Sequence, residues 1–110
     1  MPNLKIYVDE TIFDWTRPRL SDALEPIRAL LCDAFRVEPQ ACQLAVIPVL
    51  GLPDQPQVNI ELLIFPRAER TGEAIRVAGE RLRSLLASAT DARVAVRISQ
   101  LDPLTYVALK

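Results

Sequence analysis

The sequence predicts an α+β fold in which two strand–helix–strand repeats form a four-stranded mixed sheet with both helices on one face. Two observations carry this prediction. Four segments alternate apolar and polar residues with a period of two, and two longer segments place apolar residues at steps of three and four. Crossover connections prefer one handedness, which puts both helices on the same side of the sheet. The 110 residues, 50% of them apolar, have the length of one domain over residues 1–110.

The first repeat opens the chain. Alternation over residues 3–8 predicts a strand, and an apolar stripe over residues 17–35 predicts an amphipathic helix. Pro26 is expected either to kink this helix or to lie near its effective start, because proline removes an interior backbone donor. A largely apolar strand is predicted over residues 43–50, and the Gly and Pro residues of 51–56 predict a loop.

The second repeat follows the same order. Alternation over residues 58–65 predicts a long strand, and Pro66 is expected either to end this strand or to place it at a sheet edge. The apolar stripe over residues 75–86 predicts the second helix, and residues 93–99 predict the fourth strand. Residues 106–109 are candidates for a short tail strand.

The sheet face opposite the helices is predicted to be mixed in character. It is too apolar for free solvent and too polar for an ordinary core, with Ala45, Ile47, Leu63 and Phe65 beside Asn59, Glu61 and Arg97. We therefore expect subunits of a homo-oligomer to cover this face by packing sheet against sheet.

The composition excludes several classes of function. Thirteen Lys and Arg against fourteen Asp and Glu give a net charge of −1, which argues against a nucleic-acid or anionic-membrane binder. Histidine is absent, which removes the commonest general base and nearly every ordinary catalytic zinc site. No apolar run approaches the ~18 residues of a membrane span, and no signal segment is recognisable, so a cytoplasmic protein is expected.

The two cysteines, Cys32 and Cys42, do not have the spacing of metal ligands and can form at most one disulfide. Cys32 lies in the first helical pattern, where a free thiol is expected to behave as a small buried apolar group.

The Met1–Pro2 start offers an unusual base. A small second residue is the ordinary condition for removal of an initiator methionine, which would leave Pro2 with a free secondary amine. Burial in an apolar, partly cationic pocket would lower the pKa of that amine, because desolvation and nearby positive charge both disfavour the ammonium form. The neutral amine could then accept a proton near pH 7.

Met1–Pro2 running into a strand, the length of about 110 residues and the doubled strand–helix–strand order resemble the tautomerase superfamily. That superfamily includes macrophage migration inhibitory factor, 4-oxalocrotonate tautomerase and 5-carboxymethyl-2-hydroxymuconate isomerase, and the sequence looks closest to the last. Further matching segments are Pro26, Arg70–Thr71, Arg76–Glu80, Leu101–Pro103 and Ala108–Lys110.

The resemblance implies a homotrimer with active sites between subunits, in which Pro2 moves protons between oxygen and carbon of a small unsaturated 2-hydroxy or 2-keto acid. Neither a metal nor an organic cofactor is implied. Arg70 falls at the position of one arginine that binds the substrate carboxylate. A second such arginine has no counterpart, because Gln43 and Leu44 occupy its place.

Three further residues are weaker candidates for substrate binding. Arg17 lies near the place of a substrate arginine in the smaller tautomerases, although Arg19 is an equal candidate. Arg97 could project into an active-site wall, or it could pair with Glu61 across the sheet. Tyr106 is a candidate contact from a neighbouring subunit, or it is a packing anchor.

Three functions remain open on the sequence alone. The first is a tautomerase or isomerase with Pro2 as general base and then acid. The second is a related hydratase or decarboxylase in which a protonated Pro2 acts as acid. The third is a catalytically silent trimeric module that binds a ligand or a partner, which the missing arginine at Gln43 favours.

Overall fold

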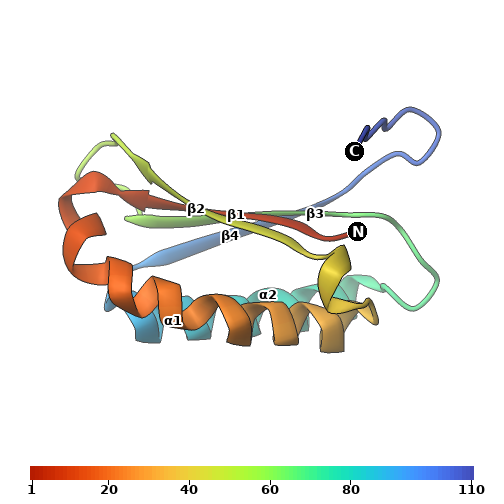
Figure 1. Ribbon diagram of the computed structural model, residues 1–110, viewed down its shortest axis with the longest axis horizontal. Coiled ribbons are helices and arrows are strands. Elements are labelled where there is room, and N and C mark those ends of the chain that lie inside the picture. Colours follow the sequence, from red (N-terminus) through yellow and green to blue (C-terminus); the bar gives the residue numbers. More distant parts are fainter.

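A four-stranded sheet with two helices on one face makes up the computed structural model, which describes all 110 residues (Figure 1). The elements in chain order are β1 (Asn3–Asp9), α1 (Glu10–Phe35), a 3-10 turn (Pro39–Ala41), β2 (Gln43–Val49), β3 (Val58–Ile64), α2 (Gly72–Thr90) and β4 (Val94–Gln100). This arrangement confirms the predicted fold class.

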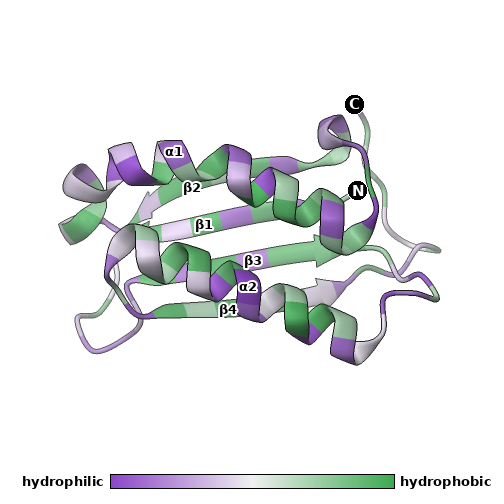
Figure 2. Ribbon diagram, turned by 90° about the horizontal axis from the view of Figure 1, so that it is seen from below, coloured by the Kyte–Doolittle hydropathy of each residue, from purple (hydrophilic) through white to green (hydrophobic).

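The sheet has the strand order β2-β1-β3-β4 and is mixed. Each repeat contributes one parallel pair, β1 with β2 and β3 with β4. The two repeats join through the antiparallel pair of β1 and β3, with Ile6 opposite Ile60. The view from the helical side shows α1 over β2 and β1, and α2 over β3 and β4 (Figure 2). The two central strands therefore come from the two repeats, and both begin or end near the amino terminus of the chain.

The core lies between the helices and the sheet. Alternate residues of the central strands point into it and are fully buried, because one face of each strand meets the apolar stripes of the helices. The members with no exposed surface are Leu4, Ile6, Val8, Ile27, Leu31, Val58, Ile60, Leu62, Ile64, Leu82 and Leu86.

Helix α1 begins at Glu10, seven residues before the predicted start. The Asp9 carboxylate accepts hydrogen bonds from the Thr11 amide (2.9 Å) and hydroxyl (2.6 Å), which caps the helix directly after β1. Pro26 does not mark the start of the helix, since both Pro18 and Pro26 lie inside α1. Both prolines are exposed, so water can reach the carbonyls that they leave without an intrahelical partner.

Helix α2 is capped by Thr71, whose hydroxyl accepts a hydrogen bond from the Ala74 amide at 3.1 Å. We expect Thr71→Ala to lower the free energy of unfolding by about 1 kcal/mol, because this cap satisfies one of the orphan amides of the first turn. Urea denaturation measures the loss. Thr71→Ser keeps the hydroxyl and is the matched control, so an equal loss in both variants would contradict the capping role.

The predicted tail strand over residues 106–109 is absent. After β4 the chain turns, with the Thr105 and Tyr106 amides both donating to the Asp102 carbonyl at 3.1 and 3.0 Å. This turn carries the last residues over the helix-free side of the sheet toward the amino terminus (Figure 1). The tail pairs with no strand of this chain.

The sheet face opposite the helices has no cover from the chain over most of its area (Figure 1). It carries half-buried Tyr7, Ile47 and Leu63 beside exposed Glu61 and Arg97. The Tyr7 hydroxyl donates to Glu61 at 3.3 Å, so polar groups on this face partly satisfy one another. The mixed character predicted for this face is thus present.

Candidate active site

Pro2 lies buried at the start of β1. Its carbonyl accepts a hydrogen bond from the Gln43 amide at 2.9 Å, which extends the pairing of β1 with β2 by one residue. This bond fixes the backbone of Pro2 against the first residue of β2. The nitrogen of Pro2, which carries Met1 in this chain, is therefore held in one place by the sheet.

A depression of about 520 Å³ opens beside this end of β1. The chain ends meet here, since the tail lies over the amino terminus (Figure 1). The lining of the depression comes from four separate parts of the chain and consists of Met1, Asn3, Gln43, Phe65, Tyr106, Ala108, Leu109 and Lys110. The mixture of apolar walls with a few polar groups is typical of small-ligand sites.

The amino group of Met1 has a lowered pKa. Partial burial lowers the pKa of this amine below its ordinary value of 8.0, and the positive charges of Arg70, Arg67 and Lys110 lower it further. Both effects disfavour the ammonium form. The charges of Arg70, Arg67 and Lys110 thus act on the end of the chain next to Pro2.

Arg70 is buried, with 4% of its surface exposed. Its guanidinium donates to the Phe65 carbonyl at 2.6 Å and to the Phe35 carbonyl at 3.0 Å, and it stacks over the Phe35 ring. Phe35 is the last residue of α1, so Arg70 satisfies a carbonyl at the negative end of the helix dipole. The Nε atom is buried without a hydrogen-bond partner. Burial lowers the pKa of this guanidinium, which nevertheless stays charged.

Gln43 and Tyr106 both reach the depression. Gln43, which stands where the resemblance expects an arginine, is exposed and lines the depression with a neutral amide. Tyr106 packs edge-on against Phe65, with ring centroids 5.3 Å apart. Predicted as a contact from a neighbouring subunit, Tyr106 already lies beside the amino terminus of its own chain.

Two candidate arginines, Arg97 and Arg17, do not line the depression within one chain. Arg97 is exposed on the helix-free face of β4 and donates to the Asn59 side chain at 3.3 Å. It stands opposite Glu61 in the strand register but makes no ion pair with it, so the expected pairing is wrong. Arg17 is exposed in the first part of α1, and α1 begins at the end of the sheet opposite the chain's amino terminus (Figure 1). A substrate contact for either residue stays a prediction that requires a second subunit.

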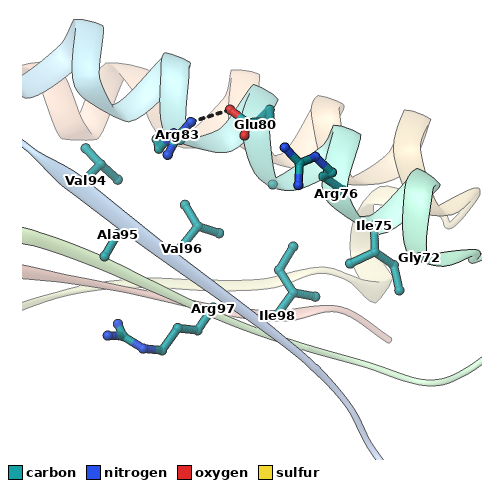
Figure 3. Close-up of a pocket in the computed structure, with 11 residues that line it drawn as sticks. Gly72, Ile75, Arg76, Glu80, Arg83, Val94, Ala95, Val96, Arg97 and Ile98 are labelled. Carbon is teal, nitrogen blue, oxygen red and sulfur yellow. Dashed lines mark hydrogen bonds and ion pairs between the residues drawn. The ribbon is translucent and has the colours of Figure 1, made fainter.

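A larger hollow, of about 640 Å³, runs along the outer edge of the molecule between α2 and β4. Figure 3 shows Val94, Val96 and Ile98 pointing toward α2 across this groove, while Arg97 points to the other side of the strand. Its polar rim includes the ion pair of Arg83 with Glu80 at 2.6 Å. Neither the amino terminus nor the buried Arg70 lines this groove, so the smaller depression at the amino terminus is the better candidate for proton transfer.

Cys32 and Cys42 lie close together near the same end of the sheet. Their Sγ atoms are 4.0 Å apart, and both thiols are free and half-buried. Burial and the neighbouring Cys32 thiol raise the pKa of Cys42 to about 11. The expectation of a fully buried Cys32 is thus not met.

Comparisons by sequence find neither a matching family model nor a matching curated protein. Comparisons by structure find close matches over nearly the whole chain. A macrophage migration inhibitory factor-like protein from Entamoeba histolytica has a TM-score of 0.73 at 11% identity, covering 97% of this chain and 94% of that one. A domain of unknown function from Sebaldella termitidis has a TM-score of 0.74 at 17% identity, covering 98% and 95%.

Malonate semialdehyde decarboxylase, which was also solved with its first residue changed from proline to alanine, has a TM-score of 0.64 at 16% identity, covering 97% of this chain and 90% of that one. At such low identities the likeness establishes a shared fold. The chain has the fold of the tautomerase superfamily, a class of proteins that includes tautomerases, a dehalogenase family and decarboxylases.

Sequence reasoning missed several residues of the site. The sequence places Phe65 on the helix-free sheet face. Arg67 and Lys110 are not among the predicted site residues, because most lysines and arginines are surface residues without a site role. Lys110 stood in a segment that matched the superfamily, which was a usable signal. Nothing in the linear pattern shows that the tail folds back over the first strand.

No helix of the structure is long and apolar enough to cross a membrane.

Proposed function

We propose that this protein is a cofactor-independent tautomerase or isomerase of small unsaturated 2-hydroxy or 2-keto carboxylic acids, with the amine of Pro2 as the proton carrier after removal of Met1. The observation that carries the proposal is the Met1 amino group next to Pro2, whose pKa is lowered by burial and by Arg70, Arg67 and Lys110, at a depression of ligand size. The superfamily fold and the resemblance to 5-carboxymethyl-2-hydroxymuconate isomerase support it.

The proton transfer follows from this setting. Neutral Pro2 accepts the hydroxyl proton of an enol acid and returns it to carbon, so one group serves as base and then as acid. The cationic surroundings stabilise the enolate and the substrate carboxylate through charge. The substrate is thus attracted by the same field that keeps the amine neutral.

The residues that we propose to contact the substrate are not the two carboxylate-binding arginines that the resemblance implies. Arg70 already holds two backbone carbonyls and is deeply buried, so we assign it a mainly electrostatic role with Nε as its one donor atom without a partner. Lys110 lies at the depression and supplies a mobile cation for one carboxylate. Gln43 supplies a neutral amide, which favours a monocarboxylate over a dicarboxylate.

Tautomerisation of phenylenolpyruvate tests the proposal, together with mass spectrometry of the native N-terminus and NMR titration of its nitrogen. We expect a chain that begins at Pro2, a pKa below that of an ordinary terminal amine, and enol–keto conversion faster than in buffer. A retained Met1 or an unshifted amine in the assembled protein would refute it.

The pH profile separates base from acid catalysis. If Pro2 is the base, kcat/KM rises as the pH increases through the pKa of the amine and then levels off. If a protonated Pro2 acts as the acid of a hydratase or decarboxylase, kcat/KM falls over the same range. A profile that falls would therefore replace the tautomerase with the second function.

The proposal includes a homotrimer whose subunits cover the helix-free sheet face. Sedimentation should give about three times the chain mass of 12.3 kDa. Half-buried Leu63 lies on this face, so Leu63→Glu should shift the protein toward monomers because it puts a charge into the interface. Leu63→Met keeps the apolar contact and is the control. A wild-type monomer at micromolar concentration would contradict the trimer.

A further inference from the structure

The cysteine pair stands next to the candidate active site without taking part in it. Cys32 lies in the last part of α1, and Cys42 lies directly before β2. Their Sγ atoms, 4.0 Å apart, approach closely for residues ten positions apart. A disulfide bond needs about 2.05 Å between sulfurs, so the two must move about 2 Å closer.

Small oxidants can reach this pair. Cys42 lines a shallow hollow of about 230 Å³ together with Glu25, Arg28 and Gln43. The Arg28 charge favours the thiolate of Cys42, although burial and Cys32 outweigh it. Cys42 is therefore mostly protonated at neutral pH, which slows its attack on an oxidant.

The backbone links this pair to the proton carrier. Gln43 follows Cys42, and its amide holds the Pro2 carbonyl at 2.9 Å. The Gln43 side chain lines the depression. A shift of Cys42 toward α1 must move the Gln43 backbone or strain its hydrogen bond to Pro2.

We propose that Cys32 and Cys42 form a redox modification site, in which an intrachain disulfide displaces Gln43 and weakens the hold of β2 on Pro2. The oxidant is a low-molecular-weight disulfide. One cysteine thiolate attacks it and expels one small thiol, forming a mixed disulfide. The second cysteine then displaces the other small thiol, so two protein thiols and one small disulfide give one protein disulfide and two small thiols.

Incubation of the wild-type protein with oxidised glutathione tests the chemistry. Because the chain has only two cysteines, titratable thiols should fall from two to zero per chain. Trypsin cleaves after Arg36, between the cysteines, so peptides 29–36 and 37–67 should appear as one linked species. Two remaining thiols, stable glutathione adducts or links between chains would overturn the proposal.

Amide hydrogen exchange tests the effect on the site without using activity. The Gln43 amide should exchange at least tenfold faster in the oxidised protein, while the Ile60 amide in the middle of the sheet should not change. In Cys32→Ser and in Cys42→Ser the oxidant should leave the Gln43 amide unaffected. A disulfide that leaves Gln43 exchange unchanged would overturn the coupling to Pro2.

The predicted loss of activity rests on the proposed function. Oxidation should lower kcat/KM about tenfold, because small displacements of a reacting group reduce catalysis steeply, and reduction with dithiothreitol should restore it. If the reduced protein has no tautomerase activity, the proposed function fails, while the linked peptides and Gln43 exchange still decide the redox site. Unchanged activity after complete oxidation would overturn the regulatory effect.

Discussion

Pro2→Ala is expected to lower kcat/KM for enol–keto conversion at least about 100-fold, the usual contribution of a positioned acid–base group. Pro2 donates no backbone hydrogen bond, and its carbonyl contact to the Gln43 amide persists in an alanine. The substitution should thus leave the fold intact while replacing the secondary amine with a primary one. Initial rates with phenylenolpyruvate measure the effect.

Extension of the chain by one glycine before Pro2 is the matched control. It keeps the proline ring and its packing but turns the nitrogen into an amide that cannot accept a proton. We expect the same loss as for Pro2→Ala. Activity within threefold of wild type in both variants would exclude Pro2 as the proton carrier.

Arg70→Met should have two large effects of different origin. It leaves the Phe35 and Phe65 carbonyls without their donor, which should cost about 3 kcal/mol of unfolding free energy. It also removes a positive charge beside the amino terminus, so the pKa of the amine rises toward its ordinary value. The rising limb of the pH–rate profile therefore moves to higher pH, and activity at neutral pH falls.

Arg70→Lys separates the two effects. A lysine keeps the charge but cannot reproduce both carbonyl contacts of the planar guanidinium. We expect stability to fall while the pH profile stays near that of the wild type. Denaturant unfolding and pH–rate curves measure the two quantities independently. An identical pH profile in Arg70→Met and wild type would rule out the electrostatic role.

The fold could be predicted because each strand and helix shows its own periodicity. The alternation over Leu4, Ile6 and Val8 gives a strand whose buried face is fixed by sequence alone. Boundaries were harder where capping decided them. Asp9 is both the last residue of β1 and the N-cap of α1. The apolar pattern does not show this boundary, because the capping contact is polar.

The site could be predicted only in part. The Pro2 start indicated the end of the sheet where the depression lies, but the other lining residues come from positions distant in sequence, such as Phe65 and Lys110. The burial of Arg70 depends on where α1 ends relative to the loop before α2. Those distances arise from tertiary packing, which a single sequence does not encode in any local pattern.

The meeting of the first strand with the folded-back tail affects how the protein should be prepared. A purification tag at either end would lie over the depression beside Pro2. The exposed loop around Asp54, between β2 and β3, lies at the other end of the sheet. An affinity sequence inserted there would leave both chain ends free. Assays on protein with a terminal tag would underestimate the proposed activity.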